Sequence, residues 1–171
     1  YIKETAMQKN VTKLLVFSDS HGRAGKMSAA FSEHPDADAV IFLGDGLRDA
    51  VRVFCGCEKT VAAVCGNCDS SGDIEAAKAI GAALPEITLD IGGVRVMCAH
   101  GHRYDVKSGL SRIAEAAKAR GAGLVLFGHT HVPTEVHLDG ALLFNPGSIA
   151  SGSYGIIYIQ DGAILCSHGT V

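Results

Sequence analysis

Several features that mark other classes of protein are missing from this chain of 171 residues. No apolar run reaches the roughly 18 residues that a membrane span requires, so we expect no membrane partner. The formal net charge is only −3, which gives no electrostatic reason to bind a nucleic-acid polymer. A small phosphate-bearing substrate is compatible with this composition, provided that a metal supplies positive charge locally.

The chain also lacks a linker, an internal repeat and a low-complexity tract. With 47% hydrophobic and 19% charged residues, it is long enough to bury one substantial core. We therefore predict a single domain over residues 13–171. Residues 1–12 begin with a polar stretch that has no apolar centre of the signal-peptide kind, so we expect a disordered or artificial N-terminal extension and a cytoplasmic protein.

The six cysteines do not form the pattern of a disulfide or zinc framework. Cys65-Gly-Asn-Cys68 has the spacing of a redox or zinc pair, but no second pair accompanies it. Most of the cysteines lie in or beside apolar runs. We expect reduced thiols, as is typical of cytosolic proteins.

The first half of the sequence alternates apolar runs of strand length with helical patterns. Residues 14–17, 39–43 and 61–64 are continuously apolar, as in strands buried on both faces, and Thr60 opens the third predicted strand, residues 60–64. Residues 24–34 and 47–54 carry apolar side chains at helical spacing. This alternation with short connections predicts right-handed crossovers and a largely parallel sheet.

The second half adds three expected hairpins to a helix and a strand. We predict a helix over residues 108–120 with Ser108 as its cap, and a strand over residues 123–127. Residues 71–82 fit either a helix or a mobile flap. The whole pattern indicates an α/β protein with two mixed β-sheets flanked by helices. The hairpin arms are residues 86–91 with 94–98, 134–138 with 141–144, and 154–159 with 163–167.

Side chains that can bind metals follow five of the predicted strands. An aspartate after a strand is usually a turn former, and a single histidine is usually a rim residue. However, the carboxyl ends of parallel strands meet at one edge of a sheet, where ligands collect. Five of the eight histidines fall in these loops, whereas His34, His137 and His168 lie elsewhere and are treated as surface residues. The candidate metal ligands are Asp19, His21, Asp45, Asn67, His100, His129 and His131.

Oxygen and imidazole donors without a thiolate suit Mn, Fe, Zn or Co better than Ca or Mg alone. The set is larger than one tetrahedral ion uses, which implies two ions that share a bridging carboxylate. Two such cations lower the pKa of a shared water and hold the oxygens of an in-line displacement at phosphorus. The pattern therefore predicts hydrolysis of a phosphoester.

The ordered motifs resemble the calcineurin-like metallophosphoesterase superfamily over nearly the whole chain from Lys13 onward. They are Asp19-Ser-His21, Gly44-Asp45, Gly66-Asn67, His100 and Gly128-His129-Thr-His131. Gly66-Asn67-Cys68-Asp69, the short length and Asn145-Pro-Gly-Ser148 are similar to the small bacterial and archaeal phosphodiesterases of the YfcE type. The resemblance implies a four-layer α/β-β/α sandwich and two divalent metal ions. Mn is favoured, Fe, Zn, Ni and Co are alternatives, and similar proteins often form homodimers.

The resemblance also implies a role for each matching residue. Asp19, His21 and His131 would bind the first metal, and Asn67, His100 and His129 the second. Asp45 would bridge the two ions, and a hydroxide held between them would be the nucleophile. Asn67 would also hold phosphoryl oxygens in the transition state, which gives it a catalytic role.

One position departs from the pattern of the superfamily. Many members carry a histidine where this chain has Cys68, and that histidine is thought to protonate the leaving group. A thiol with a pKa of about 8.5 is a poor replacement. We therefore expect either substrates with good leaving groups or another proton donor such as His102. The alternative for His102 is a hydrogen bond within its own turn.

Further candidates lie beside the ligands in the sequence. Ligating imidazoles need an acceptor for their second nitrogen, and Asp49, Asp69 and the backbone near Asn145 are candidates. Arg23 and Arg103 are candidates for contact with phosphate, or else solvated loop charges.

The alternatives to an enzyme are a metal-binding scaffold and a structural zinc module. A non-catalytic metal-binding scaffold on the same fold is favoured where ligands are lost, but here every ligand position is filled. A structural zinc module requires a closed set of four ligands, usually with cysteines. We therefore predict a metal-dependent phosphoesterase, most simply a phosphodiesterase that acts on a small phosphoester.

Overall fold

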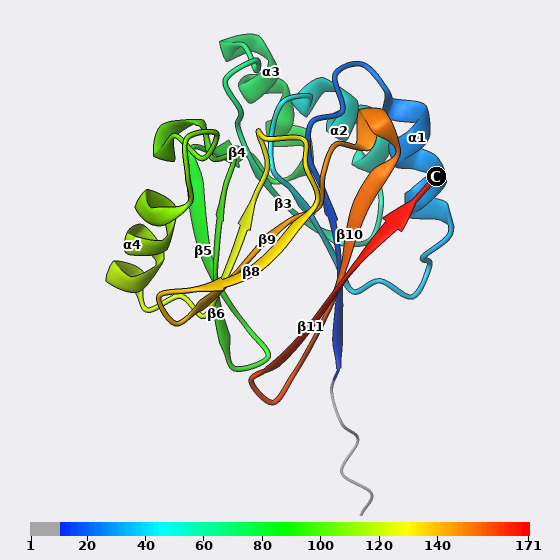
Figure 1. The fold of residues 1–171 in the computed structure, drawn as a ribbon. Helices are drawn as coiled ribbons and strands as arrows, with labels where there is room; N and C mark the ends of the chain where they lie inside the picture. The colour runs from blue at the N-terminus through cyan, green and yellow to red at the C-terminus, as the bar shows by residue number, and fades with distance from the viewer. Residues whose placement is uncertain (1–10) are drawn as a thin grey trace, which may run out of the picture.

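Two β-sheets face each other in the computed structural model, which describes residues 11–171 (Figure 1). The first ten residues of the expected N-terminal extension lie outside the described residues. The boundary of that extension was placed slightly too late, because Thr12 already belongs to the first strand, β1 (Thr12–Phe17).

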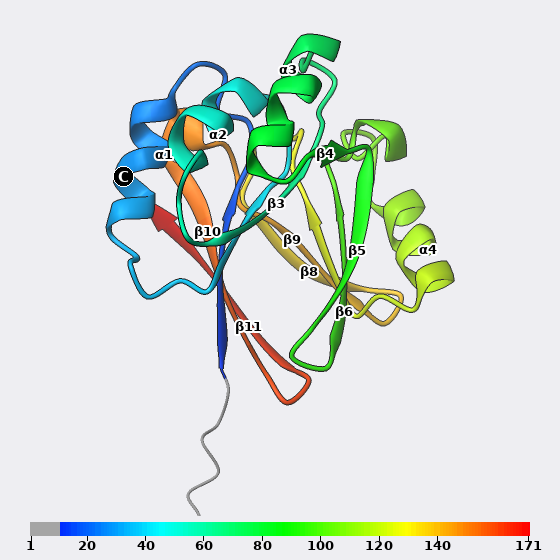
Figure 2. The same ribbon diagram turned by 180° about the vertical axis from the view of Figure 1, so that it is seen from behind.

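The first sheet has six strands in the order β11-β10-β1-β2-β3-β4. Its parallel strands are β1, β2 (Ala39–Phe42), β3 (Thr60–Val64) and the short β4 (Ala83–Leu84). The hairpin of β10 (Ser153–Gln160) and β11 (Ala163–Thr170) adds antiparallel strands beside β1. Helices α1 (Ala24–Ser32), α2 (Leu47–Phe54) and α3 (Ser71–Ala76) lie on the side of this sheet that faces away from the second one (Figures 1 and 2).

The second sheet has five strands in the order β5-β6-β7-β9-β8. Strands β6 (Val94–Ala99), β7 (Leu124–Phe127) and β9 (Ala141–Asn145) run parallel. The edge strands β5 (Glu86–Ile91) and β8 (Thr134–Leu138) pair antiparallel with their neighbours. Helix α4 (Ser111–Arg120) covers the outer face of this sheet (Figure 2). Both sheets are therefore mixed, as predicted.

Alternating residues of the central strands enter different hydrophobic cores. In β1, Leu15 and Phe17 pack toward α1 and α2, whereas Leu14 and Val16 pack between the sheets. In β7, Leu126 faces the space between the sheets and Phe127 belongs to the core under α4. Three separate cores thus fill the three spaces of a four-layer sandwich, which explains why these strands are apolar at every position.

Two local expectations change in the structure. Helix α4 begins at Ser111 rather than at residue 108, because the Ser108 hydroxyl donates to Asp105 Oδ1 at 2.9 Å and caps no helix. Residues 71–82, left open between helix and flap, form α3 followed by a 3₁₀ helix at Ala77–Ile80. Ser70 and Asp73 form a capping box at the start of α3.

The other histidines also differ in part from the expectation. His34 is half-buried, and its Nε2 lies 2.9 Å from the Tyr154 hydroxyl. His137 and His168 are exposed as expected, and His168 also stacks on the Phe144 ring and contacts the Asn145 carbonyl. Among the described residues, no helix has the length and apolar character needed to cross a bilayer.

Candidate metal centre

The loops that follow the parallel strands hold most of the candidate ligands in unusual backbone conformations. Asp19, His21, Asp45, His129 and His131 all have positive φ angles, between 41° and 68°. Residues other than glycine rarely adopt this region, and such residues cluster at functional sites. The surrounding hydrogen bonds must therefore hold these loops in place.

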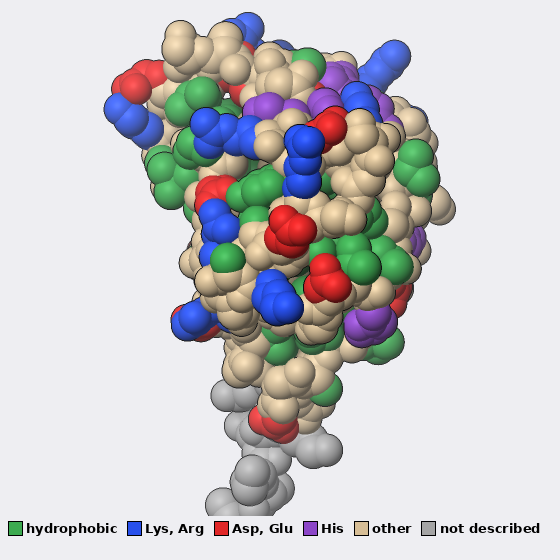
Figure 3. All heavy atoms as spheres, turned by 60° about the vertical axis from the view of Figure 1, so that its left-hand side comes forward, with side chains coloured by type: hydrophobic (Ala, Val, Ile, Leu, Met, Phe, Trp, Pro, Cys, Tyr) green, Lys and Arg blue, Asp and Glu red, His purple; other side chains and the backbone are tan. Residues whose placement is uncertain are grey.

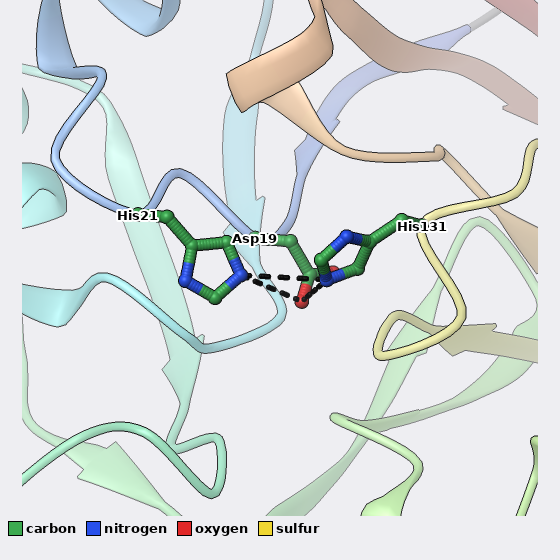
Figure 4. Close-up of side chains that lie close together, drawn as sticks. All are labelled: Asp19, His21 and His131. Carbon is green, nitrogen blue, oxygen red and sulfur yellow. Dashed lines mark hydrogen bonds and ion pairs between the residues drawn. The ribbon is translucent and has the colours of Figure 1, made fainter.

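The first group of ligand atoms comes from Asp19, His21 and His131 (Figure 4). Asp19 Oδ1 lies 3.1 Å from His131 Nε2 and 3.8 Å from His21 Nε2, and the two imidazole nitrogens are 3.3 Å apart. Asp19 is fully buried, yet its Oδ1 has no hydrogen-bond partner among the described residues. A buried, unpartnered carboxylate oxygen that faces two imidazoles is suited to binding a cation.

The second group comes from Asp45, His100 and His129. His100 Nε2 lies 3.4 Å from Asp45 Oδ2 and 3.2 Å from His129 Nδ1. His100 Nδ1 lies 2.7 Å from the Leu43 carbonyl oxygen. Because a carbonyl only accepts hydrogen bonds, this contact places the proton on Nδ1. Nε2 of the neutral ring is then left with a lone pair that faces the group.

The two groups adjoin each other. His100 Nε2 is 3.9 Å from Asp19 Oδ1, so the second group begins where the first ends. Asp45 also forms a third set of close donors with His21 and Cys68. The carboxylate of Asp45 therefore lies between donors from both sides of the centre. Histidine side chains gather at this end of the molecule, with lysine or arginine side chains around them (Figure 3).

The electrostatics of the centre favour ionised Asp45 and act in opposite directions on His100 and His129. Burial raises the pKa of Asp45, but hydrogen bonds from His100 and from the Cys68 N–H lower it more, so the pKa lies below its usual range. Burial lowers the pKa of His100, and the Asp45 and Asp19 carboxylates raise it above the ordinary value. Burial, followed by the charge of His100, lowers the pKa of His129.

Known proteins resemble this chain. Residues 12–162 match the model of the calcineurin-like phosphoesterase superfamily domain. The chain belongs to this superfamily. Over 157 residues it is 29% identical to the probable metallophosphoesterase YsnB of Bacillus subtilis, which covers 88% of this chain and 86% of that protein.

Solved structures share the fold. A predicted phosphoesterase from Streptococcus pneumoniae has a TM-score of 0.75 at 25% identity. The match covers 94% of this chain and 90% of the other chain. Vacuolar protein sorting 29 from Cryptosporidium parvum has a TM-score of 0.73 at 17% identity and covers 94% and 99% of the two chains. The family resemblance and the sandwich of two mixed sheets are thus confirmed, and the family supports a metal-dependent phosphoesterase.

Divalent metals are implied by the superfamily, and the residues of this phosphoesterase fit them. Asp19 Oδ1 is the buried oxygen without a partner, and oxygen and imidazole donors converge around it. Both types of donor suit divalent first-row metals. Glycine at position 66 keeps the centre open, because a Cβ there would lie 2.0 Å from Asp45 Oδ1.

Backbone groups, rather than imidazoles, are the partners of the predicted supporting residues. The Asp69 carboxylate accepts the N–H groups of Asp45, Gly46, Leu47 and Gly66 at 2.8–2.9 Å. We expected Asp69 to orient an imidazole. It instead ties the loop after β2 to the loop after β3.

Asp49 and Asn145 also hold loops of the phosphoesterase in place. Asp49 Oδ2 accepts the Ser20 hydroxyl and the Gly22 N–H, both at 2.7 Å, and thus fixes the loop that carries His21. Asn145 acts through its side chain, which donates to the Gly128 carbonyl at 2.9 Å. The expectation that Asp49 and the backbone near Asn145 would accept from ligating imidazoles was therefore wrong, since the imidazole at the Asn145 carbonyl is that of His168.

Asn67 and Cys68 lie at the exposed rim of the centre. The Asn67 side-chain nitrogen donates to Cys68 Sγ at 3.3 Å. The Cys68 N–H donates to Asp45 Oδ1 at 2.8 Å. Hydrogen bonding to Asp45, followed by burial, raises the pKa of the Cys68 thiol. The thiol is therefore protonated at neutral pH and is a weaker acid than a free cysteine.

His102 packs beside the second group, with its ring centroid 5.4 Å from that of His100 and 6.1 Å from that of His129. Its Nδ1 is buried and has no hydrogen-bond partner among the described residues. Nδ1 therefore makes no hydrogen bond of the kind that the alternative, a bond within its own turn, requires. Arg23 and Arg103 are exposed, and no side-chain hydrogen bond of theirs occurs within residues 11–171.

Sequence reasoning missed three residues that shape the centre. Ser18 donates its hydroxyl to Asp19 Oδ2 at 2.5 Å, and Leu43 supplies the carbonyl that orients His100. Arg48 lines a cleft beside Asp45. Ser18 was detectable as a hydroxyl at the end of the same strand as Asp19, whereas a backbone carbonyl has no signal in the sequence.

Proposed function

We propose that this protein is a phosphodiesterase that uses two divalent cations. Asp19, His21 and His131 would hold one cation, and Asn67, His100 and His129 the other, with Asp45 between them. The observation that carries the proposal is the buried Oδ1 of Asp19, which faces imidazoles of both groups and accepts no hydrogen bond. Mn is the favoured metal, with Fe, Zn, Ni and Co as alternatives.

When bound, the two cations would supply a hydroxide at neutral pH and neutralise charge on the phosphoryl oxygens. The chain's own residues orient the reaction. Asn67 lies at the open rim, where its amide can donate to a phosphoryl oxygen. The Leu43 carbonyl fixes the ring of His100, and Ser18 and the His129 N–H fix Asp19 through Oδ2.

The charges around the centre support a diester rather than a monoester. A phosphate monoester carries close to two negative charges at neutral pH, since its second pKa is about 6, whereas a diester carries one. Behind Asp19 and Asp45, the carboxylates of Asp49 and Asp69 add further negative charge. These carboxylates offset much of the positive charge of the two proposed cations, so extra negative charge on the substrate is disfavoured. We also infer small phosphoesters as substrates, without nucleic-acid polymers or membranes as partners. A homodimer and a cytoplasmic location stay predictions.

Metal-dependent turnover tests the proposal. We expect chelated protein to be inactive, and Mn to restore hydrolysis of bis-p-nitrophenyl phosphate at a rate at least about tenfold above that of p-nitrophenyl phosphate, in line with the charge argument. The chelated protein should stay folded by circular dichroism, because three hydrophobic cores hold it together without metal. A non-catalytic scaffold predicts no turnover with any of the five metals, and a structural zinc module predicts unfolding on chelation.

His102 is the proposed proton donor to the leaving group, because its half-buried ring lies beside His100 and His129. Replacing His102 with alanine should slow hydrolysis of an alkyl phosphodiester by about 100-fold or more, the usual contribution of a general acid. Hydrolysis of bis-p-nitrophenyl phosphate should change little, because p-nitrophenolate leaves without a proton. His137→Ala, at an exposed histidine on β8, is the matched control. Equal losses for both substrates would contradict the role.

A further inference from the structure

A cleft of about 270 Å³ opens from the candidate metal centre toward helices α2 and α3. His21, Asp45 and Cys68 form its inner end, next to the centre. Arg48 of α2 and Asp73 of α3 line its outer part. These helices lie side by side above the ends of the strands (Figures 1 and 2). A phosphoester held at the centre would therefore extend one of its substituents into this cleft.

The acidic side chains of the cleft are occupied by partners within the protein. Asp69 accepts four backbone N–H groups. Asp49 accepts the Ser20 hydroxyl and the Gly22 N–H. Asp73 Oδ2 accepts the N–H and the hydroxyl of Ser70. These carboxylates thus have little capacity left to bind a ligand.

Arg48 offers free hydrogen-bond donors in the cleft. Its Nε and Nη2 both lie 2.9 Å from Asp73 Oδ1, and Asp73 is itself fixed by the capping box with Ser70. A guanidinium has five N–H donors in a rigid plane, so donors on Nη1 and Nη2 stay available. The side chain is 76% exposed, so a ligand can reach it. The ion pair with Asp73 lies at the cleft, and an exposed pair of this kind holds the side chain only weakly.

Charge and size restrict what the cleft can hold. One guanidinium faces four carboxylates in the lining, namely Asp45, Asp49, Asp69 and Asp73. The outer part therefore disfavours a second anionic group and favours an uncharged acceptor of hydrogen bonds. The volume is below the about 300–1,000 Å³ of pockets for drug-sized ligands. It suits one substituent up to the size of a nucleoside, and not a chain of several.

We propose that Arg48 binds an uncharged polar substituent of the substrate, so that the preferred substrates are phosphodiesters with one sugar-like or nucleoside-like group. This inference rests on the proposed function. It adds a residue that selects among phosphodiesters, whereas the metal ligands act on all of them.

Two chromogenic diesters with the same leaving group test the proposal in the Mn-loaded protein. They are the p-nitrophenyl ester of thymidine 5′-phosphate and methyl p-nitrophenyl phosphate. We expect the wild type to have a KM about tenfold lower for the thymidine ester, the effect of one hydrogen bond from a charged donor. Arg48→Ala should remove most of this KM ratio. A phosphate added at the 3′ position of the thymidine ester should raise KM rather than lower it.

Two further variants keep the proposal open to refutation. Arg52→Ala changes another exposed arginine of α2 that does not line the cleft, and it should preserve the KM ratio. Asp73→Asn keeps an acceptor for Ser70 and removes both the charge and the oxygen that pair with Arg48. It should keep the KM ratio within about twofold of the wild type if Arg48 contacts the substrate directly.

The outcomes separate the two levels of inference. Hydrolysis of both esters with a KM ratio unaffected by Arg48→Ala would overturn the role of Arg48 alone. If Asp73→Asn and Arg48→Ala reduce the KM ratio equally, Arg48 does not contact the substrate and only positions α3. No hydrolysis of either ester by the metal-loaded wild type would overturn the proposed function itself.

Discussion

Asp45→Asn is expected to lower kcat/KM for bis-p-nitrophenyl phosphate by at least about 1,000-fold, well above the 10–100-fold that partners of metal ligands contribute. Asp45 lies with His100 and His129 on one side and with His21 on the other. Asparagine retains the shape of the side chain and an oxygen that can accept the Cys68 N–H. It removes the negative charge and one oxygen donor. The variant should therefore fold, but its side chain at position 45 should no longer bind the two proposed cations.

Metal content gives an independent readout of the same substitution. We expect elemental analysis to find about two Mn ions per wild-type chain and one or fewer per Asp45→Asn chain, as in a two-metal site that has lost its shared ligand. Asp90→Asn is the matched control, because Asp90 is a 70%-exposed partner of Arg95 on the edge strand β5. That variant should keep its activity and its metal. Wild-type activity in Asp45→Asn would show that the carboxylate is not a ligand.

The fold was predictable where burial alone decides the structure. Strand β3 and helix α2 have the predicted bounds, because unbroken apolar runs and a clear helical face leave few alternatives. The start of α4 was wrong because Ser108 has a competing local partner, Asp105. The helix α3 was left open, although Ser70 followed by Asp73 three residues later is a capping-box pattern.

The sequence allowed us to predict which residues gather at the candidate site. It did not allow us to predict which groups orient them. The carboxyl ends of parallel strands must meet, so Asp19, Asp45 and His100 were expected to lie close together. What orients them is mostly backbone, such as the Leu43 carbonyl and the four N–H groups around Asp69. Every residue carries these groups, so only the conformation of the loops decides which of them point toward a side chain.

Asp69→Asn is expected to lower the free energy of unfolding of the metal-free protein by about 2–4 kcal/mol, because unpaired buried donors cost about 1–3 kcal/mol each. Each oxygen of Asp69 accepts two N–H groups, and the four come from Asp45, Gly46, Leu47 and Gly66. Asparagine places an NH₂ group against two of the N–H groups, so two donors lose their acceptor. Urea unfolding of the chelated protein should show a lower midpoint with an unchanged slope.

The same substitution should weaken metal binding, because Asp69 fixes the backbone on both sides of Asp45. A loss of about 10–100-fold in Mn affinity is expected, as for other residues that orient metal ligands. The kcat of the protein saturated with Mn should fall much less than in Asp45→Asn, because the ligands themselves remain. This split between affinity and turnover distinguishes a residue that positions the centre from one that binds the metal. An Asp69→Asn variant with wild-type stability and Mn affinity would show that the loops hold their conformation without these four hydrogen bonds.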